Sequence, residues 1–373
     1  MIYANLKDLA QTLSGSIIMV LSTLVLAVSA LASCNGEPEN YRVFIVTYFE
    51  STHAVNSDSA FDSRCHYYIN PRGQRECQIR LRGALYVPLA SAYDVPPGHA
   101  PAQFPAIVLN HGSEHTFPPR SLWCEIANYF VPKDYIVFAP FRRGHGDGLN
   151  DANKSTGVYV EDMLTDWLSN NPQYVHDTIC TTVSCYKAQL LRQQADQEIA
   201  SAMDYMKNRT DVKTDPDNPQ QFRIALMGIS YGGAVTVFAN RLEIGQKAAV
   251  PFSPGAQQWA PDNCSYNPNC GTAFQRTLIS AAGNAKKPAF YIQAKWDYDT
   301  RATIDLAYAH AYLSSIDPTH SHPYNAAIYE YRNPCPDRPC TPDDYQSIHT
   351  GFFIDTAVWG KEVHDFLKRN DVK

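Results

Sequence analysis

The sequence predicts an α/β fold in which a mostly parallel sheet carries helices on both faces. Short, continuous apolar runs indicate strands that are buried on both sides, as in parallel sheets. Longer helical stretches separate these runs, and one Gly-x-Ser-x-Gly motif stands where a strand-like run meets a helical stretch. Such alternation is typical of doubly wound α/β domains.

The composition is that of a globular protein with a sizeable core. The chain has 373 residues, of which 45% are hydrophobic and 12% aromatic, which suits one large domain with insertions. Its formal charge is −6 and no basic block occurs, so a nucleic-acid partner is disfavoured.

Residues 1–33 have the pattern of an export signal. Residues 17–32 read IIMVLSTLVLAVSALA, a run without a charge that is short for a membrane span. The positive bias before it is weak, because Lys7 is followed by Asp8, so an uncleaved anchor remains an alternative. We expect a signal peptide.

Cys34 ends the sequence LASC, which resembles the lipobox of bacterial lipoproteins. In those proteins the cysteine carries a lipid and becomes the new N-terminus. Ordinary cleavage after Ala32 is the alternative. The resemblance implies an exported protein of the bacterial periplasm or cell surface, attached to a membrane through a lipid anchor at Cys34.

The remaining cysteines also indicate an oxidising compartment. Eight of them form close pairs in the sequence: Cys65/Cys77, Cys180/Cys185, Cys264/Cys270 and Cys335/Cys340. We expect four short disulfide loops. Zinc is the competing interpretation, but no Cys-x-x-Cys occurs and no metal site is predicted. Cys124, in the helical stretch SLWCEIANYF, is predicted to be a buried free thiol.

The expected elements follow one another from residue 79 onward. The first strand, IRLRGALYVP at 79–88, alternates apolar and polar residues. The next are AIVLN at 106–110, YIVFA at 135–139, RIALM at 223–227, AAVPF at 248–252 and AFYIQA at 289–294. Helices are expected at 121–130, 187–207, 234–242, 301–315 and 355–368.

These elements divide the chain into a lead-in and one α/β domain. Residues 34–78 are a weakly patterned lead-in, and residues 79–373 form the domain. Residues 149–194 carry no strand signal, and we expect them to form a lid-like insertion over the carboxyl ends of the strands, where ligands bind in such sheets.

The sharpest motif is GISYGG, at residues 228–233. It follows the run RIALM directly and precedes a helical stretch, so Ser230 lies at a strand-to-helix turn. Glycines at 228 and 232 let the backbone turn sharply there, and the turn presents the serine hydroxyl above the sheet. A plain glycine-rich turn is the alternative.

A nucleophilic serine needs a base, and in this topology an acid and then a histidine follow the serine. His349 comes after the last strand-like run and before the terminal helix, and we predict that it is the base. The other downstream histidines lie in helical stretches or in a polar loop: His310, His320, His322 and His364.

The acid that orients this histidine is expected just past the strand AFYIQA. Asp297 and Asp299 both follow that strand, and Asp297 is nearer to its end. We predict Asp297 as the acid, with Asp299 as the alternative and otherwise an N-terminal helix residue.

Two loops border the predicted site. Asn110-His111-Gly112-Ser113 follows a strand, where a backbone N–H can be offered to an oxyanion, and the N–H of Tyr231 is the second donor. The loop RRGHGDG at 142–148 meets neither GxGxxG nor a P-loop pattern, so a tight structural turn is the better interpretation than a phosphate loop.

From about Leu81 to the C-terminus the chain resembles α/β-hydrolases of the dienelactone hydrolase and prolyl-oligopeptidase-like group. The resemblance lies in LYVP, NHGS, APFRRGHG, GISYGG, PFSPGAQQW, the DYDT segment and HTGF followed by VWGKEVHDFL. It implies Ser230 as nucleophile, Asp297 as acid and His349 as base. Tyr231 and Ser113 are implied as oxyanion donors.

Two departures limit what the resemblance implies about substrate. Dienelactone hydrolases in the narrow sense carry cysteine where this chain has Ser230, and the peptidases usually carry a propeller, for which the segment before the first core strand is too short. We therefore expect a serine esterase without a cofactor, acting on a small-molecule ester. The alternatives are a serine peptidase for small peptides and a non-catalytic surface lipoprotein.

Overall fold

The computed structural model describes much of the α/β domain and part of the segment before it. The described residues are 41–49, 66–69, 75–78, 80–91, 101–113, 120–143, 145, 188, 191–192, 194–256, 259, 272–316, 324–336, 338 and 340–373. Several sequence predictions lie outside them, namely the signal peptide (1–33), Cys34, nearly all of the 149–194 insertion, Cys65, Cys180, Cys185, Cys264, Cys270, His320 and His322.

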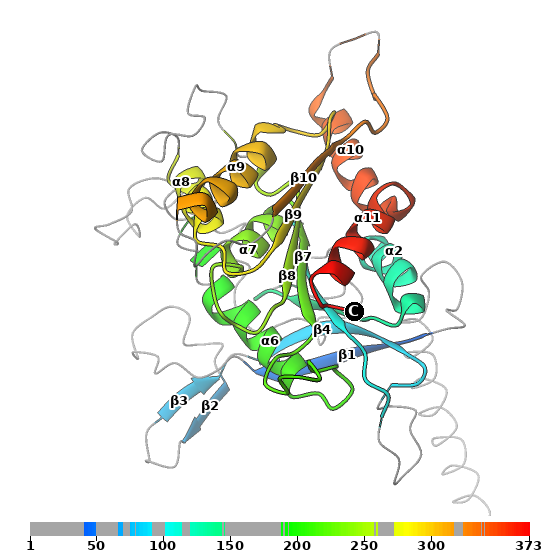
Figure 1. Ribbon diagram of the computed structural model, residues 1–373, viewed down its shortest axis with the longest axis vertical. Coiled ribbons are helices and arrows are strands. Elements are labelled where there is room, and N and C mark those ends of the chain that lie inside the picture. Colours follow the sequence, from blue (N-terminus) through cyan, green and yellow to red (C-terminus); the bar gives the residue numbers. More distant parts are fainter. Residues whose placement is uncertain are drawn as a thin grey trace, which may run out of the picture.

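Eight strands form one sheet in the order β1-β4-β6-β5-β7-β8-β9-β10 (Figure 1). Their bounds are β1 (Tyr41–Phe49), β4 (Arg80–Pro88), β5 (Ala106–Asn110), β6 (Ile136–Phe141), β7 (Ile224–Ile229), β8 (Ala248–Phe252), β9 (Ala289–Ala294) and β10 (Tyr324–Tyr329). β4 is antiparallel to both β1 and β6, and the strands from β6 to β10 are parallel. This order, with its second strand reversed, is that of the α/β-hydrolase fold and confirms the predicted fold class.

Helices cover both faces of the sheet (Figure 1). One layer contains α6 (Ala200–Lys207), α7 (Tyr231–Ala239), α8 (Ala273–Gly283) and α9 (Arg301–Ile316), and the other contains α2 (Arg120–Phe130), α10 (Pro342–Ile354) and α11 (Thr356–Arg369). A 3₁₀ turn, η2 (Val131–Lys133), follows α2, and a π-helical segment, η6 (Gln194–Ile199), precedes α6. β2 (His66–Ile69) and β3 (Arg75–Gln78) form a separate hairpin.

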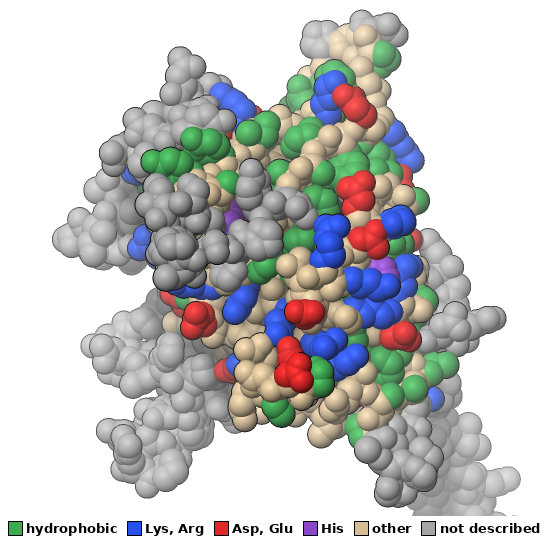
Figure 2. Space-filling model, viewed as in Figure 1, with side chains coloured by type: hydrophobic (Ala, Val, Ile, Leu, Met, Phe, Trp, Pro, Cys, Tyr) green, Lys and Arg blue, Asp and Glu red, His purple; other side chains and the backbone are tan. Residues whose placement is uncertain are grey.

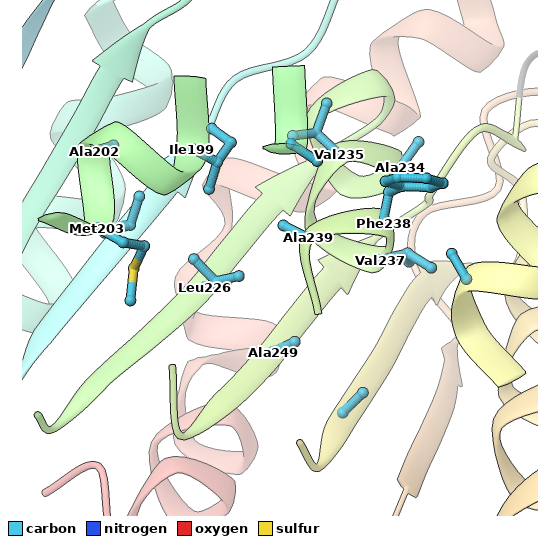
Figure 3. Close-up of a cluster of buried hydrophobic side chains, with 14 of the residues drawn as sticks. Ile199, Ala202, Met203, Leu226, Ala234, Val235, Val237, Phe238, Ala239 and Ala249 are labelled. Carbon is cyan, nitrogen blue, oxygen red and sulfur yellow. The ribbon is translucent and has the colours of Figure 1, made fainter. Parts of the chain in front are cut away.

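The central strands are apolar because helices cover both of their faces. Every residue of β5, β6, β7, β8 and β9 is buried. Figure 3 shows part of one of the two apolar clusters, in which Met203 of α6 lies beside Leu226 of β7 and Phe238 extends from α7. Close packing of this kind fixes α7, whose first residue directly follows Ser230.

The sheet begins earlier in the chain than the sequence pattern indicated. β1 lies within the predicted lead-in (34–78) and pairs with β4 along its whole length. It is an edge strand whose middle residues are only half-buried, so its apolar pattern is weak. α8 and α10 were also absent from the expected helices, and each begins at a threonine whose side chain forms a capping box, Thr272 and Thr341.

The described cysteines confirm one predicted bridge and contradict another prediction. Cys335 and Cys340 form a disulfide with a Cα–Cα distance of 5.5 Å. Cys124 is buried on α2, as its apolar neighbours suggested, but it is disulfide-bonded rather than free. The helical pattern around Cys124 carries no signal that it forms a bridge.

Cys77 lies in a strand, whereas its spacing from Cys65 suggested the end of a short disulfide loop. It is the third residue of β3 and stands opposite Tyr67 of β2 in the antiparallel register. The sequence of this strand, RECQ, is short and mostly polar, so it gave no strand signal. The predicted partner, Cys65, lies outside the described residues, and the bridge from Cys77 to Cys65 therefore stays a prediction.

Acidic and basic side chains are interspersed on the face drawn in Figure 2. Among the described residues, no helix is long and apolar enough to cross a bilayer.

Candidate active site

Ser230 lies at a strained turn between β7 and α7. Its backbone has φ 57° and ψ −120°, outside the regions that residues with a side chain usually occupy. Its N–H donates to the Phe252 carbonyl at 2.9 Å, and its own carbonyl accepts from the Ala234 N–H at 3.0 Å. The turn therefore holds a half-buried serine at the N-terminus of α7, where the first backbone N–H groups have no partner within the helix.

Three glycines let the turn form. A Cβ at Gly228 would lie 2.4 Å from the Gly232 carbonyl oxygen, and one at Gly232 would lie 2.1 Å from the His111 carbonyl oxygen. A Cβ at Gly233 would lie 2.6 Å from the Phe252 carbonyl oxygen. The motif thus needs glycine because the neighbouring backbone occupies the space of a side chain.

Asp297 and His349 contact each other although 52 residues separate them. His349 Nδ1 lies 2.8 Å from both carboxylate oxygens of Asp297. Both side chains are buried, with 2% of Asp297 and 4% of His349 exposed. An Nδ1–H that donates to the carboxylate leaves Nε2 as the basic nitrogen, which is the tautomer that a general base requires.

Two further donors hold the Asp297 carboxylate. The Tyr298 N–H donates to Oδ1 at 2.6 Å, and the Ser253 hydroxyl donates to Oδ2. Ser253 directly follows β8 and has φ 44°, a conformation that is uncommon for serine. Sequence reasoning missed Ser253, and its only signal was its place in PFSPGAQQW, directly after a strand.

Asp299 has a different environment from Asp297. Its carboxylate pairs with the Arg301 guanidinium and accepts the Arg301 backbone N–H at 3.0 Å, at the start of α9. This is the N-terminal helix position expected for it. Among the two candidate acids, only Asp297 contacts His349 in the described structure.

His349 belongs to a helix that the sequence pattern did not predict. It lies in α10, which begins after Thr341 with Pro342 at its first position. The ring of Tyr298 packs edge-on against the imidazole, with 5.4 Å between the ring centroids. The imidazole is thus held by a carboxylate on one atom and by an aromatic ring on its side.

The other downstream histidines that the structure describes have other contacts. His310 is buried on α9, with its Nδ1 3.1 Å from the Tyr291 hydroxyl. His364 lies on α11, and its ring packs edge-on against Tyr135. Burial and nearby lysines lower the pKa of His364.

The strand order explains how residues distant in sequence meet. β7, β8 and β9 are parallel neighbours, so Ser230, Ser253 and Asp297 follow carboxyl ends at the same edge of the sheet. Ser230 bonds to Phe252, and the next residue, Ser253, bonds to Asp297. These contacts link the serine turn to the Asp297–His349 pair.

The predicted oxyanion donors lie at the ends of β5 and β7. β5 and β7 are paired so that Asn110 stands opposite Gly228, and the Asn110 amide donates to Thr236 of α7 at 2.8 Å. Tyr231 is the first residue of α7 and is buried, whereas Ser113 is exposed. The close approach of Gly232 to the His111 carbonyl brings the two segments together.

Arg142 anchors the loop that carries Ser113. Its guanidinium donates to the carbonyls of His111, at 2.5 Å from Nη1, and of Gly112. Burial, and then the charge of Arg142, lower the pKa of His111 well below its usual value, so this imidazole is neutral. The His145 N–H donates to the Arg142 carbonyl at 2.9 Å, a hydrogen bond typical of a tight turn, and the rest of the predicted turn at 142–148 lies largely outside the described residues.

Comparison with known proteins gives structural similarity alone. No family model and no curated protein matches the chain. An acylaminoacyl peptidase of Pyrococcus horikoshii is 13% identical with a TM-score of 0.48, and the match covers 89% of this chain but only 42% of that one. Est1E of Butyrivibrio proteoclasticus, solved with ferulic acid, is 15% identical (TM-score 0.43; 83% of this chain and 100% of that one). Acetyl xylan esterase from Paenibacillus sp. R4 is 18% identical (TM-score 0.43; 88% and 92%).

Proposed function

We propose that the protein is a serine hydrolase that cleaves carboxylic esters through an acyl-enzyme on Ser230. The observation that carries the proposal is the contact of His349 Nδ1 with Asp297, at the same sheet edge as a serine with φ 57°. A strained turn and the burial of a polar imidazole both lower the free energy of unfolding. Nucleophilic catalysis by a serine requires both features, which explains why the fold contains them.

In the first half of the reaction, the Ser230 hydroxyl oxygen attacks the ester carbonyl carbon. His349 Nε2 takes the hydroxyl proton, and the π electron pair of the carbonyl moves onto its oxygen. The N–H groups of Tyr231 and Ser113 stabilise that oxyanion. The electron pair on the oxyanion then re-forms the carbonyl double bond, and the bond from the acyl carbon to the leaving oxygen breaks. The proton passes from His349 to that leaving oxygen, and an alcohol departs.

In the second half, water replaces the serine oxygen. His349 takes a proton from water, whose oxygen attacks the acyl carbon, and the resulting intermediate expels the Ser230 oxygen. The proton returns from His349 to Ser230, and a carboxylic acid is released. Asp297 keeps its charge throughout and stabilises the imidazolium that forms twice in each cycle.

The test is ester turnover by the purified protein and by Ser230→Ala. The variant should lose up to about 10⁶-fold in kcat, because members of such a triad act as a unit. It should keep the wild-type circular dichroism spectrum and should not be labelled by a fluorophosphonate probe. Ser280→Ala, at an exposed serine on α8, is the matched control and should turn over like the wild type. A Ser230→Ala protein that retains more than a few per cent of activity would contradict the proposal.

Hydrolysis of peptide amides, measured beside hydrolysis of p-nitrophenyl esters, distinguishes the proposed esterase from the alternative of a peptidase. The esterase proposal expects ester hydrolysis to exceed amide hydrolysis in kcat/KM. Preferential amide cleavage that Ser230→Ala abolishes would replace it with a peptidase, and the absence of both activities would favour a binding role.

We also propose export and a lipid anchor at Cys34, on the sequence LASC and on the disulfide Cys335–Cys340, which suits an oxidising compartment. The wild-type protein made in a bacterial host should partition into detergent and carry an acyl mass at Cys34. Cys34→Ala should be soluble or remain uncleaved. A soluble wild-type protein that begins at Ser33 would indicate ordinary cleavage instead.

A further inference from the structure

We propose that Arg142 is a positioning residue for the oxyanion hole, because it fixes the direction of the Ser113 N–H and strengthens that group as a donor. The inference rests on the proposed function. It explains why the buried guanidinium of Arg142 binds the backbone of His111, which lies 31 residues earlier in the chain.

The guanidinium binds two successive peptide groups. Nη1 donates to the His111 carbonyl at 2.5 Å, and Nη2 donates to the Gly112 carbonyl. The His111 ring lies between the two segments: its Nδ1 lies 2.9 Å from the Gly112 carbonyl oxygen, and its Nε2 lies 3.3 Å from the Arg142 backbone nitrogen. A neutral ring with its proton on Nδ1 satisfies both contacts.

The planarity of the peptide group converts this contact into a direction for the donor. The Gly112 carbonyl and the Ser113 N–H belong to one peptide unit, and in a trans peptide these two groups point in opposite directions. The structure contains no cis peptide bond among its described residues. Because the carbonyl is held by buried Arg142, the N–H must point away from Arg142. If the guanidinium contact were lost, the contact with His111 Nδ1 would remain on this carbonyl, and the peptide plane would be held less firmly.

The charge of Arg142 acts through the same peptide unit. Arg142 is only 2% exposed, so its field is weakly screened by water. A cation bound to a carbonyl oxygen draws electron density from the peptide nitrogen, and the opposite N–H becomes a stronger donor. The guanidinium carbon also lies 5.3 Å from the ring centroid of Tyr231, which carries the other predicted donor. Arg142 thus binds the peptide that carries one proposed donor and packs against the side chain of the residue that carries the other.

The experiment compares an ester with its thionoester, in which sulfur replaces the carbonyl oxygen. Sulfur is a poor hydrogen-bond acceptor, so thionoester hydrolysis gains little from oxyanion donors, whereas misfolding affects both substrates equally. Arg142→Lys keeps the charge but loses the two-pronged contact. We expect it to lower kcat for the ester by about 100-fold with little change in KM, and the ester-to-thionoester ratio of kcat/KM by about tenfold or more.

The ratio does not depend on the amount of folded enzyme, so it can be measured even on a variant that folds in part. Arg142→Gln, which also loses the charge, should lower the ratio at least as much. Arg143→Lys is the matched control, because Arg143 is a buried arginine that pairs with Glu198, and it should keep the wild-type ratio.

A second variant tests the same donor without disturbing the core. Ser113→Pro removes the N–H at an exposed position and should lower the ratio as Arg142→Lys does. Wild-type ratios in the Arg142 variants, or in Ser113→Pro, would overturn this inference while Ser230→Ala remained inactive. A wild-type protein without ester turnover would overturn both the inference and the proposed function.

Discussion

The two halves of the candidate site are held in different ways. The serine half, Gly228 to Gly233, is fixed by backbone sterics, since three glycines face neighbouring carbonyls within 2.6 Å of where a Cβ would stand. The acid–base half depends on side chains from separate segments, since the Asp297 carboxylate binds the Ser253 hydroxyl and His349 Nδ1 as well as the neighbouring Tyr298 N–H. The first half is local in the sequence and the second is not.

This difference predicts different failures. A substitution at a glycine of the serine half should cost stability, because the backbone there cannot move without separating β5, β7 and α7. A substitution in the acid–base half should cost activity, because the side-chain contacts orient a reacting group but do not carry the sheet.

Among the changes that test this comparison, Asp297→Asn should have the largest effect. The amide cannot stabilise an imidazolium and favours the wrong tautomer of His349, so kcat should fall by about 10⁴-fold, as with the corresponding aspartate of the serine-protease triad. Thermal unfolding should change little by comparison. Asp299→Asn is the control and should reduce kcat by about tenfold or less, since its contacts are with Arg301. Inactivation by Asp299→Asn and not by Asp297→Asn would contradict the assignment.

The next effect should come from Gly232→Ala, which places a Cβ 2.1 Å from the His111 carbonyl oxygen. Overpacking against backbone should lower the free energy of unfolding by about 3 kcal/mol in urea titrations. Gly351→Ala is the matched control on α10, where the nearest atom to the new Cβ lies 3.6 Å away. It should be neutral or stabilise by about 0.5 to 1 kcal/mol through helix propensity. Equal destabilisation by both changes would remove the contrast between the halves.

The smallest effect concerns pH and His111. Its pKa is lowered in the folded state by burial and by Arg142, so below pH 6.5 the unfolded chain binds more protons than the folded one. Stability should therefore be complete above about pH 6.5 and fall below it, at up to about 1.4 kcal/mol per pH unit from this group.

Urea titrations between pH 5 and 8 measure this slope. His111→Asn should flatten it, and His364→Asn, at a half-buried histidine whose pKa is also lowered, should flatten it less. An unchanged slope in His111→Asn would show that the acid sensitivity arises elsewhere.

The sequence was informative wherever structure depends on neighbouring residues. Buried parallel strands such as Ala289–Ala294 follow from continuous apolar runs, and the Ser230 turn follows from glycines two residues away on either side. The fold class and the position of the turn could therefore be predicted. The sequence also placed an acid just past a strand end, but both Asp297 and Asp299 fitted that position.

The rest depends on contacts between distant segments. In the sequence, Arg142 is one residue of a glycine-rich turn. Its hydrogen bonds to the carbonyls of His111 and Gly112 form only because β5 and β6 are neighbours in the sheet. His349 was found by its order in the chain, but α10 was missed because Gly351 interrupts its helical pattern. Cys124 was misjudged because burial alone does not distinguish a free thiol from a bridged one.

The position of β1 determines where the chain can be shortened. A protein that began at residue 79 would lose all nine residues that pair with β4. It would also lose the hydrogen bond from Tyr41 to Asn128 and the packing of Tyr48 against Phe138 and Tyr205. The bare edge of β4 would offer its free N–H and C=O groups to any other strand, which is a template for self-association. A soluble fragment that keeps this sheet intact must therefore start ahead of Tyr41.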